Sequence, residues 1–284
     1  MQHLIIDGNN LVHRVFWVAK NQPVFNEYFH IYLFLVSVKN LALQYKPDHI
    51  VCAWDEKKDY TVNKRKELLA DYKGTRDKER NKEVHSKNEI IKQMLEHLGI
   101  KSIFPRDYEA DDVMAIYCDI FKDETKAVVT VDRDLCQLID KKTVVYEPLK
   151  KKEFKLSSFF EDHKCNKEDF VKIKALAGDK SDNIPGLKGF GKVKIAKTLS
   201  GEYILTEEEQ QQYENNIKLV DLTYSINSAD EYNYVKDQLS TSPEKSFEEF
   251  KTKCKDLSFY KILNDINVWY DTFFLRSRLA ELVG

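Results

Sequence analysis

The chain contains a series of short apolar runs that limit the folds it can adopt, and three of these runs end in an aspartate. The runs lie at residues 3–7, 48–55, 100–104, 126–132 and 143–147. Runs of this length, rich in Val and Ile, predict buried β-strands. Longer segments between them predict helices, at residues 28–45, 87–98 and 110–121. Strands that alternate with helices predict an α/β fold with a central, mostly parallel sheet flanked by helices.

The acids that end three of these runs point to a ligand site. Asp7, Asp55 and Asp132 each stand at the carboxyl end of a predicted strand, and open parallel sheets bind ligands outside those ends. Acids after strands also begin turns or cap the following helix, and for any single acid this structural explanation is as good as a role in a ligand site. For the three acids together, the ligand site is the better explanation.

A second acidic pair lies in the stretch LAGDKSDNIPGLKGFGKVKIA, residues 176–196. Asp179 and Asp182 are close in sequence, and carboxylate oxygens are the ligands that Mg²⁺ takes in sites that process phosphates. The glycines that follow predict a hairpin between two helices. Because glycine has no Cβ, the backbone N–H groups of such a hairpin can approach a phosphate. Several lysines, Lys188 and Lys192 among them, add positive charge around this hairpin.

Residues 57–87 differ from the rest of the chain in composition. They hold eleven basic residues against six acidic ones, and few large apolar side chains. Most charged runs of this kind are solvated helices or loops, and this one buries little surface to offset the entropy of ordering. Its position directly after Asp55 and its sequence Tyr72-Lys-Gly-Thr-Arg76 favour a role at the site instead. We therefore predict a segment that is weakly ordered until nucleic-acid phosphates neutralise it.

Joined to the glycine hairpin, the sequence Gly178-Asp-Lys-Ser-Asp-Asn-Ile-Pro-Gly186 closely resembles the helix–three-turn–helix signature of the 5′-nuclease, or flap endonuclease, family. That family includes the nuclease domain of bacterial DNA polymerase I and stand-alone phage enzymes. Pieces that match it run from Ile5 to Ala196, so the resemblance covers the first two-thirds of the chain by position.

The resemblance divides the chain into two regions. It implies a PIN-like α/β nuclease core at residues 1–165, with residues 57–87 as a helical arch over the active site. The remainder, residues 166–284, is implied to be helical, with the DNA-binding helix–three-turn–helix at about 170–200. Composition agrees, because the sequence predicts an amphipathic helix at 207–224 and, nearer the C-terminus, further helices whose aromatic residues serve packing.

The acidic residues that match the family's metal ligands come from separate stretches of the chain. The implied ligands of one divalent ion are Asp55, Glu109 and Asp111, with Asp7 acting through water and Asp112 in the outer shell. Those of a second ion are Asp132, Asp134, Asp179 and Asp182. Two carboxylates about 4 Å apart repel each other by about 4 kcal/mol at an effective dielectric constant of 20, so such a cluster requires cations or raised pKa values. The implied cofactors are two Mg²⁺ ions, for which Mn²⁺ can substitute.

Other residues match the family's catalytic and substrate contacts. Lys73 and Arg76, in the arch, are implied to act in catalysis at the scissile phosphate, together with the carboxylates Asp7, Asp55, Glu109, Asp111, Asp132, Asp134 and Asp182. The implied DNA contacts are Arg14, Arg65, Tyr72, Gly186, Lys188, Gly189, Gly191 and Lys192. The hairpin is also implied to hold K⁺ through its backbone carbonyls. Two positions depart from the family pattern: Val131 stands where relatives often carry glycine, and His13 where polymerase-linked relatives tend to have an aromatic residue.

Composition bounds the setting in which the chain works. Its 284 residues carry a net charge of −2, but once the predicted metal ligands are set aside the remaining chain is positive, which suits a DNA partner. No apolar run is long enough to span a membrane, and the start of the chain does not predict a secretory signal. The five cysteines lack Cys-x-x-Cys spacing, which predicts reduced thiols and a cytoplasmic setting.

The implied function is that of a Mg²⁺-dependent, structure-specific 5′-nuclease, a 5′-3′ exonuclease and flap endonuclease of DNA replication and repair. Its substrates would be 5′ ends or flaps of branched DNA, and RNA–DNA hybrids, cleaved by a two-metal mechanism. Two alternatives stay open. A non-catalytic DNA-junction-binding protein would need broken metal ligands, and a Mg²⁺-dependent phosphatase would have no use for the hairpin or the arch. We expect a monomer in the bacterial cytoplasm, including that of a phage-infected host, and, since no polymerase segment follows, a phage or stand-alone enzyme.

Overall fold

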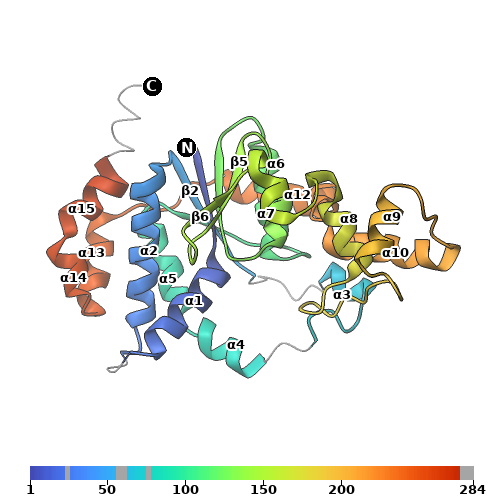
Figure 1. Cartoon of the computed structure of the whole chain (residues 1–284). Helices are drawn as coiled ribbons and strands as arrows, with labels where there is room; N and C mark the ends of the chain where they lie inside the picture. The colour runs from blue at the N-terminus through green and yellow to red at the C-terminus, as the bar shows by residue number, and fades with distance from the viewer. Residues whose placement is uncertain (23–25, 56–62, 75–77, 276–284) are drawn as a thin grey trace.

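The computed structural model describes residues 1–22, 26–55, 63–74 and 78–275. A six-stranded sheet in the order β3-β2-β1-β4-β5-β6 lies at its centre (Figure 1). The strands are β1 (His3–Asp7), β2 (His49–Ala53), β3 (Lys101–Ile103), β4 (Lys126–Val129), β5 (Thr143–Glu147) and β6 (Lys152–Phe154). Every pair is parallel except β5 with β6. The predicted α/β fold with a mostly parallel sheet is confirmed, whereas β6 was not among the predicted strands.

The central strand β1 is buried on both faces of the sheet. Leu4 and Ile6 pack into the cluster on one face, and Ile5 packs into the cluster on the other. Successive side chains of a strand point to opposite faces, and a parallel sheet is covered by helices on both. This explains why the run that forms β1 is apolar throughout.

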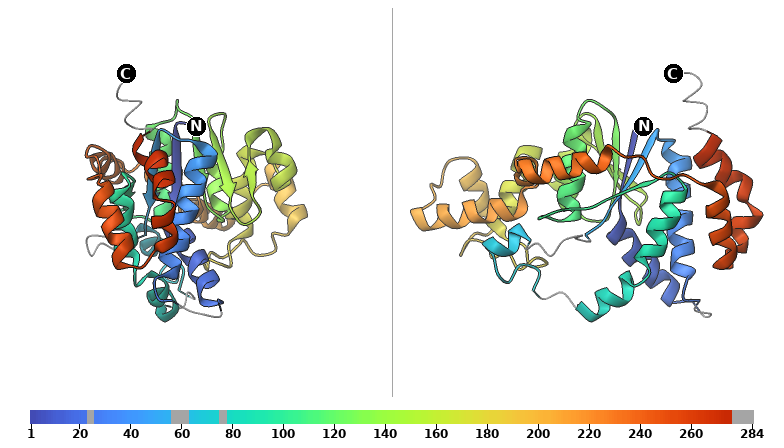
Figure 2. Two further views of the ribbon diagram at one scale, coloured as in Figure 1. Left: turned by 90° about the vertical axis from the view of Figure 1, so that its left-hand side faces the viewer. Right: turned by 180° about the vertical axis from the view of Figure 1, so that it is seen from behind.

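One face of the sheet is covered by α1 (Gly8–Lys20), α2 (Phe29–Tyr45) and α5 (Asn88–His97). Against α2 and α5 lie α13 (Phe247–Asp256), α14 (Tyr260–Asn264), α15 (Ile266–Tyr270) and the final turn η3 (Asp271–Leu275) (Figure 2). Phe250 and Trp269 are buried in the same cluster as Leu4. The aromatic residues near the C-terminus therefore pack the core, as the sequence predicts. Helix α1 was not predicted.

The opposite face is covered by helices that come later in the chain. They are α6 (Ala110–Ile120), α7 (Phe159–His163), α11 (Thr223–Ile226) and α12 (Ala229–Leu239), with the 3₁₀ turns η1 (Asp134–Leu138) and η2 (Leu156–Ser158). Val113, Phe159 and Val235 are buried there together with Ile5. The sheet is thus enclosed between two helical layers.

A third group of helices lies at the end of the molecule away from α13–α15 (Figure 1). It consists of α8 (Lys167–Ala177), α9 (Lys192–Leu199) and α10 (Glu207–Val220). Residues 178–191 connect α8 to α9, so the predicted pair of helices joined by a glycine-rich loop is present. The division of the chain at residue 165 stays a prediction.

The basic segment after β2 contains two short helices, α3 (Lys64–Leu68) and α4 (Lys78–His85). Arg65, Tyr72 and Val84 are buried, and α3 and α4 contact α10 and α1 respectively. The described parts of this segment therefore make more tertiary contacts than its composition predicts. Residues 56–62 and 75–77 lie outside the described part of the chain, and ordering by DNA stays a prediction.

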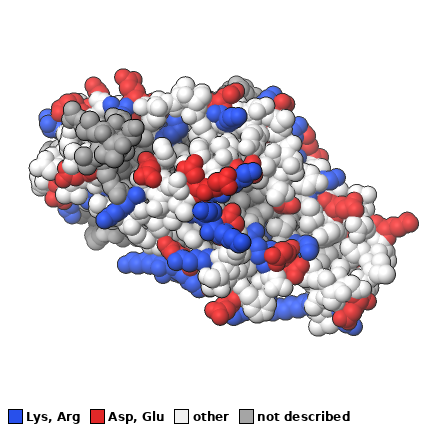
Figure 3. Space-filling view, turned by 90° about the horizontal axis from the view of Figure 1, so that it is seen from above, with Lys and Arg blue, Asp and Glu red and all other residues white. Residues whose placement is uncertain are grey.

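On the face seen from above in Figure 3, Lys and Arg side chains are interspersed with Asp and Glu. Within the described residues, no helix has both the length and the apolar character needed to cross a membrane. All five cysteines are free, and four of them are buried. They therefore behave as small core residues.

Candidate active site

Asp7 ends β1 and caps α1, and its carboxylate serves both elements. Oδ1 accepts a hydrogen bond from the Asn10 backbone N–H (3.0 Å), and Oδ2 accepts one from the Thr130 hydroxyl (2.8 Å). The next residue must be small, because a Cβ at Gly8 would lie 2.8 Å from the carbonyl oxygen of Ala53, at the end of β2. This close approach of two strand ends fixes Asp7 at the carboxyl edge of the sheet.

Asp55 follows β2 and meets the start of α6. Its Oδ1 accepts the Ala110 backbone N–H (2.8 Å), and the Asn9 amide donates to its Oδ2 (3.2 Å). Glu109 immediately precedes α6, and its backbone N–H donates to the Asp112 carboxylate (3.0 Å). Acids at a helix N-terminus are stabilised by about 0.3–1 kcal/mol each by the helix dipole. The start of α6 thus gathers carboxylates from two parts of the chain.

Asp132 and Asp134 lie in the turn that follows β4. The Asp132 N–H donates to the Thr130 hydroxyl (3.0 Å), and the Asp134 N–H donates to the Asp132 carboxylate (2.9 Å). Val131, where the resemblance led us to expect glycine, donates its backbone N–H to the side-chain oxygen of Asn10 (3.3 Å). These bonds tie the turn to α1, next to Asp7.

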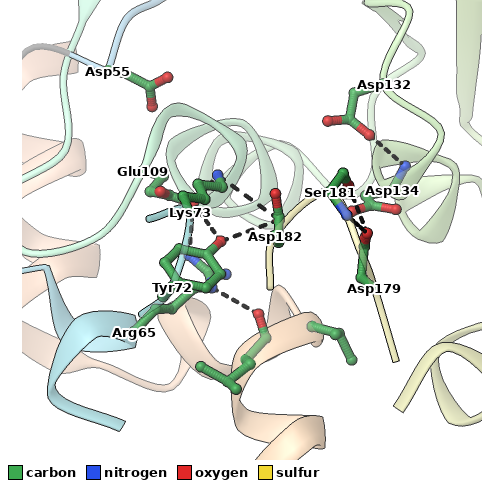
Figure 4. A network of polar contacts seen from close by, with 12 residues as sticks. Asp55, Arg65, Tyr72, Lys73, Glu109, Asp132, Asp134, Asp179, Ser181 and Asp182 are labelled. Atoms are coloured by element: carbon green, nitrogen blue, oxygen red, sulfur yellow. Dashed lines mark hydrogen bonds and ion pairs between the residues drawn. The ribbon is translucent and has the colours of Figure 1, made fainter. Parts of the chain in front are cut away.

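Asp179 and Asp182 lie in the loop between α8 and α9, within reach of Asp134. One carboxylate oxygen from each of the three lies within 4.8 Å of the other two, and Figure 4 shows Asp182 between the arch residues on one side and Asp134 and Asp179 on the other. The loop is closed by two backbone hydrogen bonds between Asp179 and Ile184 (2.9 and 2.8 Å). Two loops that are distant in sequence therefore build one acidic cluster.

Burial and mutual repulsion change the ionisation of these acids. Burial raises the pKa of Asp7 to about 7, and the charges of Asp55 and Asp132 add to this effect. Burial also raises the pKa of Asp111, with further contributions from Asp132 and Asp7. Crowded carboxylates are the donor set that hard divalent cations prefer, and a bound cation would remove the repulsion. The residues present therefore fit such ions.

Lys73 and Tyr72 contact the acids of the site directly. The Lys73 ammonium donates to Glu109 Oε2 (2.7 Å) and lies 4.0 Å from Asp182 Oδ2, and the Tyr72 hydroxyl donates to the same Glu109 oxygen (2.9 Å). The Lys73 backbone N–H donates to the Asp182 carbonyl (3.1 Å). Burial would raise the pKa of Glu109, but Lys73 and Arg65 hold it below its usual value. The arch is thus joined to the start of α6 and to the loop that carries Asp182 (Figure 4).

Lys174 is a site residue that the sequence analysis missed. Its ammonium donates to Asp134 and lies 2.6 Å from Asp179 Oδ2. Burial would raise the pKa of Asp179, yet Lys174 and Ser181 hold it at about 2. Burial raises the pKa of Asp134 in spite of Lys174. The available signal was a lysine in the last turn of the helix that leads into the acidic loop.

Arg65 and Asp112 form a buried pair that the sequence did not predict. Arg65 is 3% exposed, and its guanidinium bonds both oxygens of Asp112, which is fully buried. Arg65 Nε also donates to the Leu219 carbonyl (2.8 Å), near the end of α10. A bidentate pair of this kind fixes orientation as well as distance, so it locks α3 between α6 and α10. Arg65 was predicted to contact DNA, but in this structure it faces the protein interior, and Asp112 braces Glu109.

Gly186 packs inside its own loop. A Cβ at Gly186 would lie 2.2 Å from the Ala177 carbonyl oxygen, and one at Gly178 would lie 2.2 Å from the Gly186 nitrogen. From α10, the buried Asn216 amide donates to the carbonyls of Ala175 (2.8 Å) and Pro185 (2.7 Å). The base of the loop is therefore a contact of backbone on backbone. Gly186 has this packing task in addition to any role in DNA binding.

The tip of this loop, residues 188–192, is exposed except for Phe190. Gly189 has a positive φ of 79°, which favours glycine, and no atom lies within 4 Å of a Cβ built there or at Gly191. Helix α9 begins at Lys192 with Gly191 as its N-cap, so the unpaired N–H groups of its first turn lie beside the tip. The tip thus offers uncovered backbone together with the positive charges of Lys188 and Lys192.

The remaining predicted residues lie on α1 or outside the described chain. Arg14 is partly buried, and burial lowers its pKa, which Tyr146 of β5 opposes. The exposed His13 accepts a hydrogen bond from the Trp17 indole (3.4 Å). An aromatic ring therefore lies beside His13. Arg76 lies outside the described residues.

Residues 2–168 match the family described as the 5′-3′ exonuclease, N-terminal resolvase-like domain. The chain belongs to this 5′-3′ exonuclease family. One relative, a 5′-3′ exonuclease of Mycoplasmopsis pulmonis, is 33% identical over 204 residues, which cover 70% of this chain and 66% of the relative. DNA polymerase I of Lactococcus lactis subsp. cremoris is 35% identical over 205 residues, which cover 66% of this chain and 23% of that protein.

The fold also matches that of a solved nuclease. The flap endonuclease of bacteriophage T5, crystallised as a pseudo-enzyme-product complex with DNA and metal ions, has a TM-score of 0.67 and 21% sequence identity to the chain. The match covers 84% of this chain and 98% of the phage protein. Both the predicted 5′-nuclease family and the predicted PIN-like architecture are confirmed.

Proposed function

We propose that this chain is a Mg²⁺-dependent, structure-specific 5′-nuclease that hydrolyses phosphodiesters at the 5′ ends or flaps of branched DNA and of RNA–DNA hybrids. Membership of the 5′-3′ exonuclease family supports the activity. The observation that carries the proposal is the meeting of Asp134, Asp179 and Asp182 within 4.8 Å of one another, with the Lys73 ammonium 4.0 Å from Asp182. Acids for divalent cations and a cation for phosphate thus lie at one place.

Divalent cations are proposed at two positions in the site. Their ligands would be Asp55, Glu109 and Asp111, with Asp7, at one position, and Asp132, Asp134, Asp179 and Asp182 at the other. Bound there, Mg²⁺ or Mn²⁺ would supply Lewis acidity toward the phosphodiester. The proposal is supported by the raised pKa values of Asp7 and Asp111, which burial causes and neighbouring acids increase, because a bound cation would favour the charged form of both.

Lys73 gives the site a positive charge of its own. Its ammonium lies where negative charge on a phosphate oxygen could be stabilised as it develops during hydrolysis. Its backbone bond to the Asp182 carbonyl holds this lysine on the loop that carries the acids. Arg76 is proposed to act beside it, and Tyr72 to orient Glu109 through its hydroxyl.

The exposed tip at residues 188–192 is proposed to bind the backbone of duplex DNA. Phosphate contacts position a protein on DNA without reading the sequence, and a helix N-terminus with nearby lysines offers such contacts. K⁺ held by loop carbonyls belongs to the same proposal. Since Asn216 already donates to the Pro185 carbonyl, carbonyls nearer the tip would hold that ion. Arg14, on α1, is proposed as a further DNA contact.

The protein is proposed to work as a monomer in the bacterial cytoplasm, including that of a phage-infected host. In this proposal residues 1–165 form the nuclease core and residues 166–284 form the helical DNA-binding region.

The test is an incubation of the protein with end-labelled 5′-flap DNA, in Mg²⁺ and in EDTA. We expect cleavage in Mg²⁺ and none in EDTA. Binding of the flap without cleavage would instead favour a junction-binding protein. Release of phosphate from a small phosphomonoester, with flap DNA left intact, would favour a phosphatase.

A further inference from the structure

Helix α12 holds the loop that leads into the active site. The loop, residues 104–108, connects β3 to the start of α6. The Gln238 side chain accepts the Phe104 backbone N–H (2.9 Å) and donates to the Phe104 carbonyl (2.8 Å). The Glu231 carboxylate accepts the backbone N–H groups of Arg106 and Asp107, both at 2.8 Å. The four hydrogen bonds from α12 therefore all go to the backbone of this loop, and an ion pair between Arg106 and Asp230 (3.6 Å) adds a side-chain contact.

Glu231 is an unusual residue to find in this position. Its side chain is fully buried, and burial raises its pKa, which the two backbone N–H groups oppose. Burying a carboxylate costs several kcal/mol unless hydrogen bonds compensate it. A carboxylate can accept two N–H bonds at once, whereas an amide in the same place would satisfy one and turn its own NH₂ toward the other. The pair of N–H groups thus explains why an acid is present.

This loop leads directly into two parts of the site. Glu109 follows Asp107 by two residues, and the backbone N–H of the next residue, Ala110, donates to Asp55 (2.8 Å). In addition, the Asp107 carbonyl accepts the Lys64 N–H (3.0 Å) at the start of α3. Displacement of this backbone would therefore shift the start of α6 and that of α3 together.

We infer that Glu231 is a positioning residue of the proposed nuclease. It acts through the Arg106 and Asp107 backbone, and it sets the places of Glu109 and Asp111, which are the proposed ligands of a divalent cation. The inference rests on the proposed function for its effect on cleavage, but its effects on metal affinity and on backbone exchange do not depend on that function.

The test uses Glu231→Gln in the full chain, with Glu124→Gln as a control for the same change of side chain. Glu124 also takes part in a long-range hydrogen bond, with His3 Nε2 (2.8 Å). This bond lies at the end of β1 opposite to Asp7. For Glu231→Gln we expect kcat on flap DNA to fall by roughly tenfold or more, and Mn²⁺ affinity measured by calorimetry to fall by a similar factor, as for other residues that hold metal ligands in place. The KM for DNA should stay within about twofold. Amide exchange at Arg106 and Asp107 should become faster, and the control should change none of these quantities.

The outcomes separate this inference from the proposed function. If kcat, Mn²⁺ affinity and amide exchange are unchanged in Glu231→Gln, the inference is overturned. Cleavage of flap DNA by the wild-type protein would still support the proposed function. If the wild-type protein left flap DNA intact, the function would fail, and Mn²⁺ affinity with amide exchange would still decide the role of Glu231. Should Glu231→Gln fail to fold, Glu231→Asp carries the same test, because it keeps the charge but is too short to reach both N–H groups. A lowered Mn²⁺ affinity in that variant supports the inference, and an unchanged one overturns it.

Discussion

At the scale of single residues, the acids of this site are compensated by the protein's own lysines. Lys73 lies against Glu109 and Asp182, and Lys174 lies against Asp134 and Asp179. Each ammonium occupies a place beside the carboxylates that are proposed to hold a divalent cation. A cation that binds there must therefore displace a lysine or share its partners, so metal binding and the positions of these lysines are coupled.

Lys174→Met tests this coupling. The variant loses a partly buried cation, so the metal-free protein should unfold more easily, by about 2 kcal/mol, a value between those of exposed and buried ion pairs. The repulsion left among the acids should make Mg²⁺ stabilise the variant more than it stabilises the wild type. Thermal unfolding with Mg²⁺ and with EDTA measures both effects. An equal rise of Tm on adding Mg²⁺ in the two proteins would show that Lys174 does not compete with the metal.

Asp182→Asn separates catalysis from binding. The substitution keeps the size of the side chain and removes one negative charge from the proposed metal site. We expect flap cleavage to fall by roughly 100-fold, as when a metal site is impaired, and the Kd for flap DNA to change by less than about threefold. Single-turnover cleavage and a mobility-shift assay measure the two quantities. Equal loss of cleavage and binding would instead assign Asp182 a role in folding its loop.

The sequence indicated which acids lie together in the site, but not which basic residues pair with them. Asp7, Asp55 and Asp132 could be placed together because parallel strands bring their carboxyl ends to one edge, whatever the details of packing. Lys174 and the Arg65–Asp112 pair could not be predicted in this way. Which face of a short helix turns toward a site depends on tertiary contacts, such as the bond from Arg65 to the Leu219 carbonyl, that no local pattern encodes.

At the scale of elements, the loop between α8 and α9 depends on glycine at its base more than at its tip. Gly186→Ala would place a Cβ 2.2 Å from the Ala177 carbonyl oxygen, a clash of backbone on backbone, whereas Gly191 has open space and an allowed φ of −82°. We expect Gly186→Ala to lower the free energy of unfolding by about 2 kcal/mol or more, as overpacking does, and Gly191→Ala to change it by less than about 1 kcal/mol. Urea unfolding of both variants provides the comparison. Similar losses in the two would contradict this account of the loop.

The connection between α9 and α10 should loosen in acid. The Thr206 backbone N–H and the Lys194 ammonium hold the pKa of Glu209 at about 2, below its ordinary value of 4.5. Because the pKa in the folded protein is the lower one, these contacts contribute fully above pH 4.5 and are lost as the pH falls toward 2. Amide protection factors at the start of α10 should therefore drop between pH 5 and pH 3 by more in the wild type than in Glu209→Gln. The same drop in both proteins would exclude Glu209 as the cause.

Strand β6 and helix α1 were missed for different reasons. Strand β6 (KEF) has only three residues and joins the sheet through its pairing with β5. Helix α1 begins with Gly8, Asn9 and Asn10, which have low helix propensity, and it forms because Asp7 caps it and its apolar face packs on the sheet. In both cases tertiary contact outweighs local preference.

At the scale of the whole molecule, the site is built where two groups of elements meet. The sheet edge contributes Asp7, Asp55 and Asp132, and the helices at one end of the molecule contribute Asp179 and Asp182. Helix α3 joins these groups through Arg65, which bonds α6 and α10 at once. The sequence predicted both groups, but it could not predict that α13–α15 would pack against α2 and α5 at the other end (Figure 2), since amphipathic helices do not specify which surface they cover.

The presence of divalent cations in the site is tested most directly by anomalous diffraction at the manganese absorption edge, from crystals grown in saturating Mn²⁺. Carboxylates from separate loops are proposed to hold divalent cations, so an anomalous peak is expected between Asp134, Asp179 and Asp182, with the Lys174 ammonium moved away from Asp179. A map with no peak among these three carboxylates, and with Lys174 still bound to Asp134 and Asp179, would show that they do not hold a divalent cation.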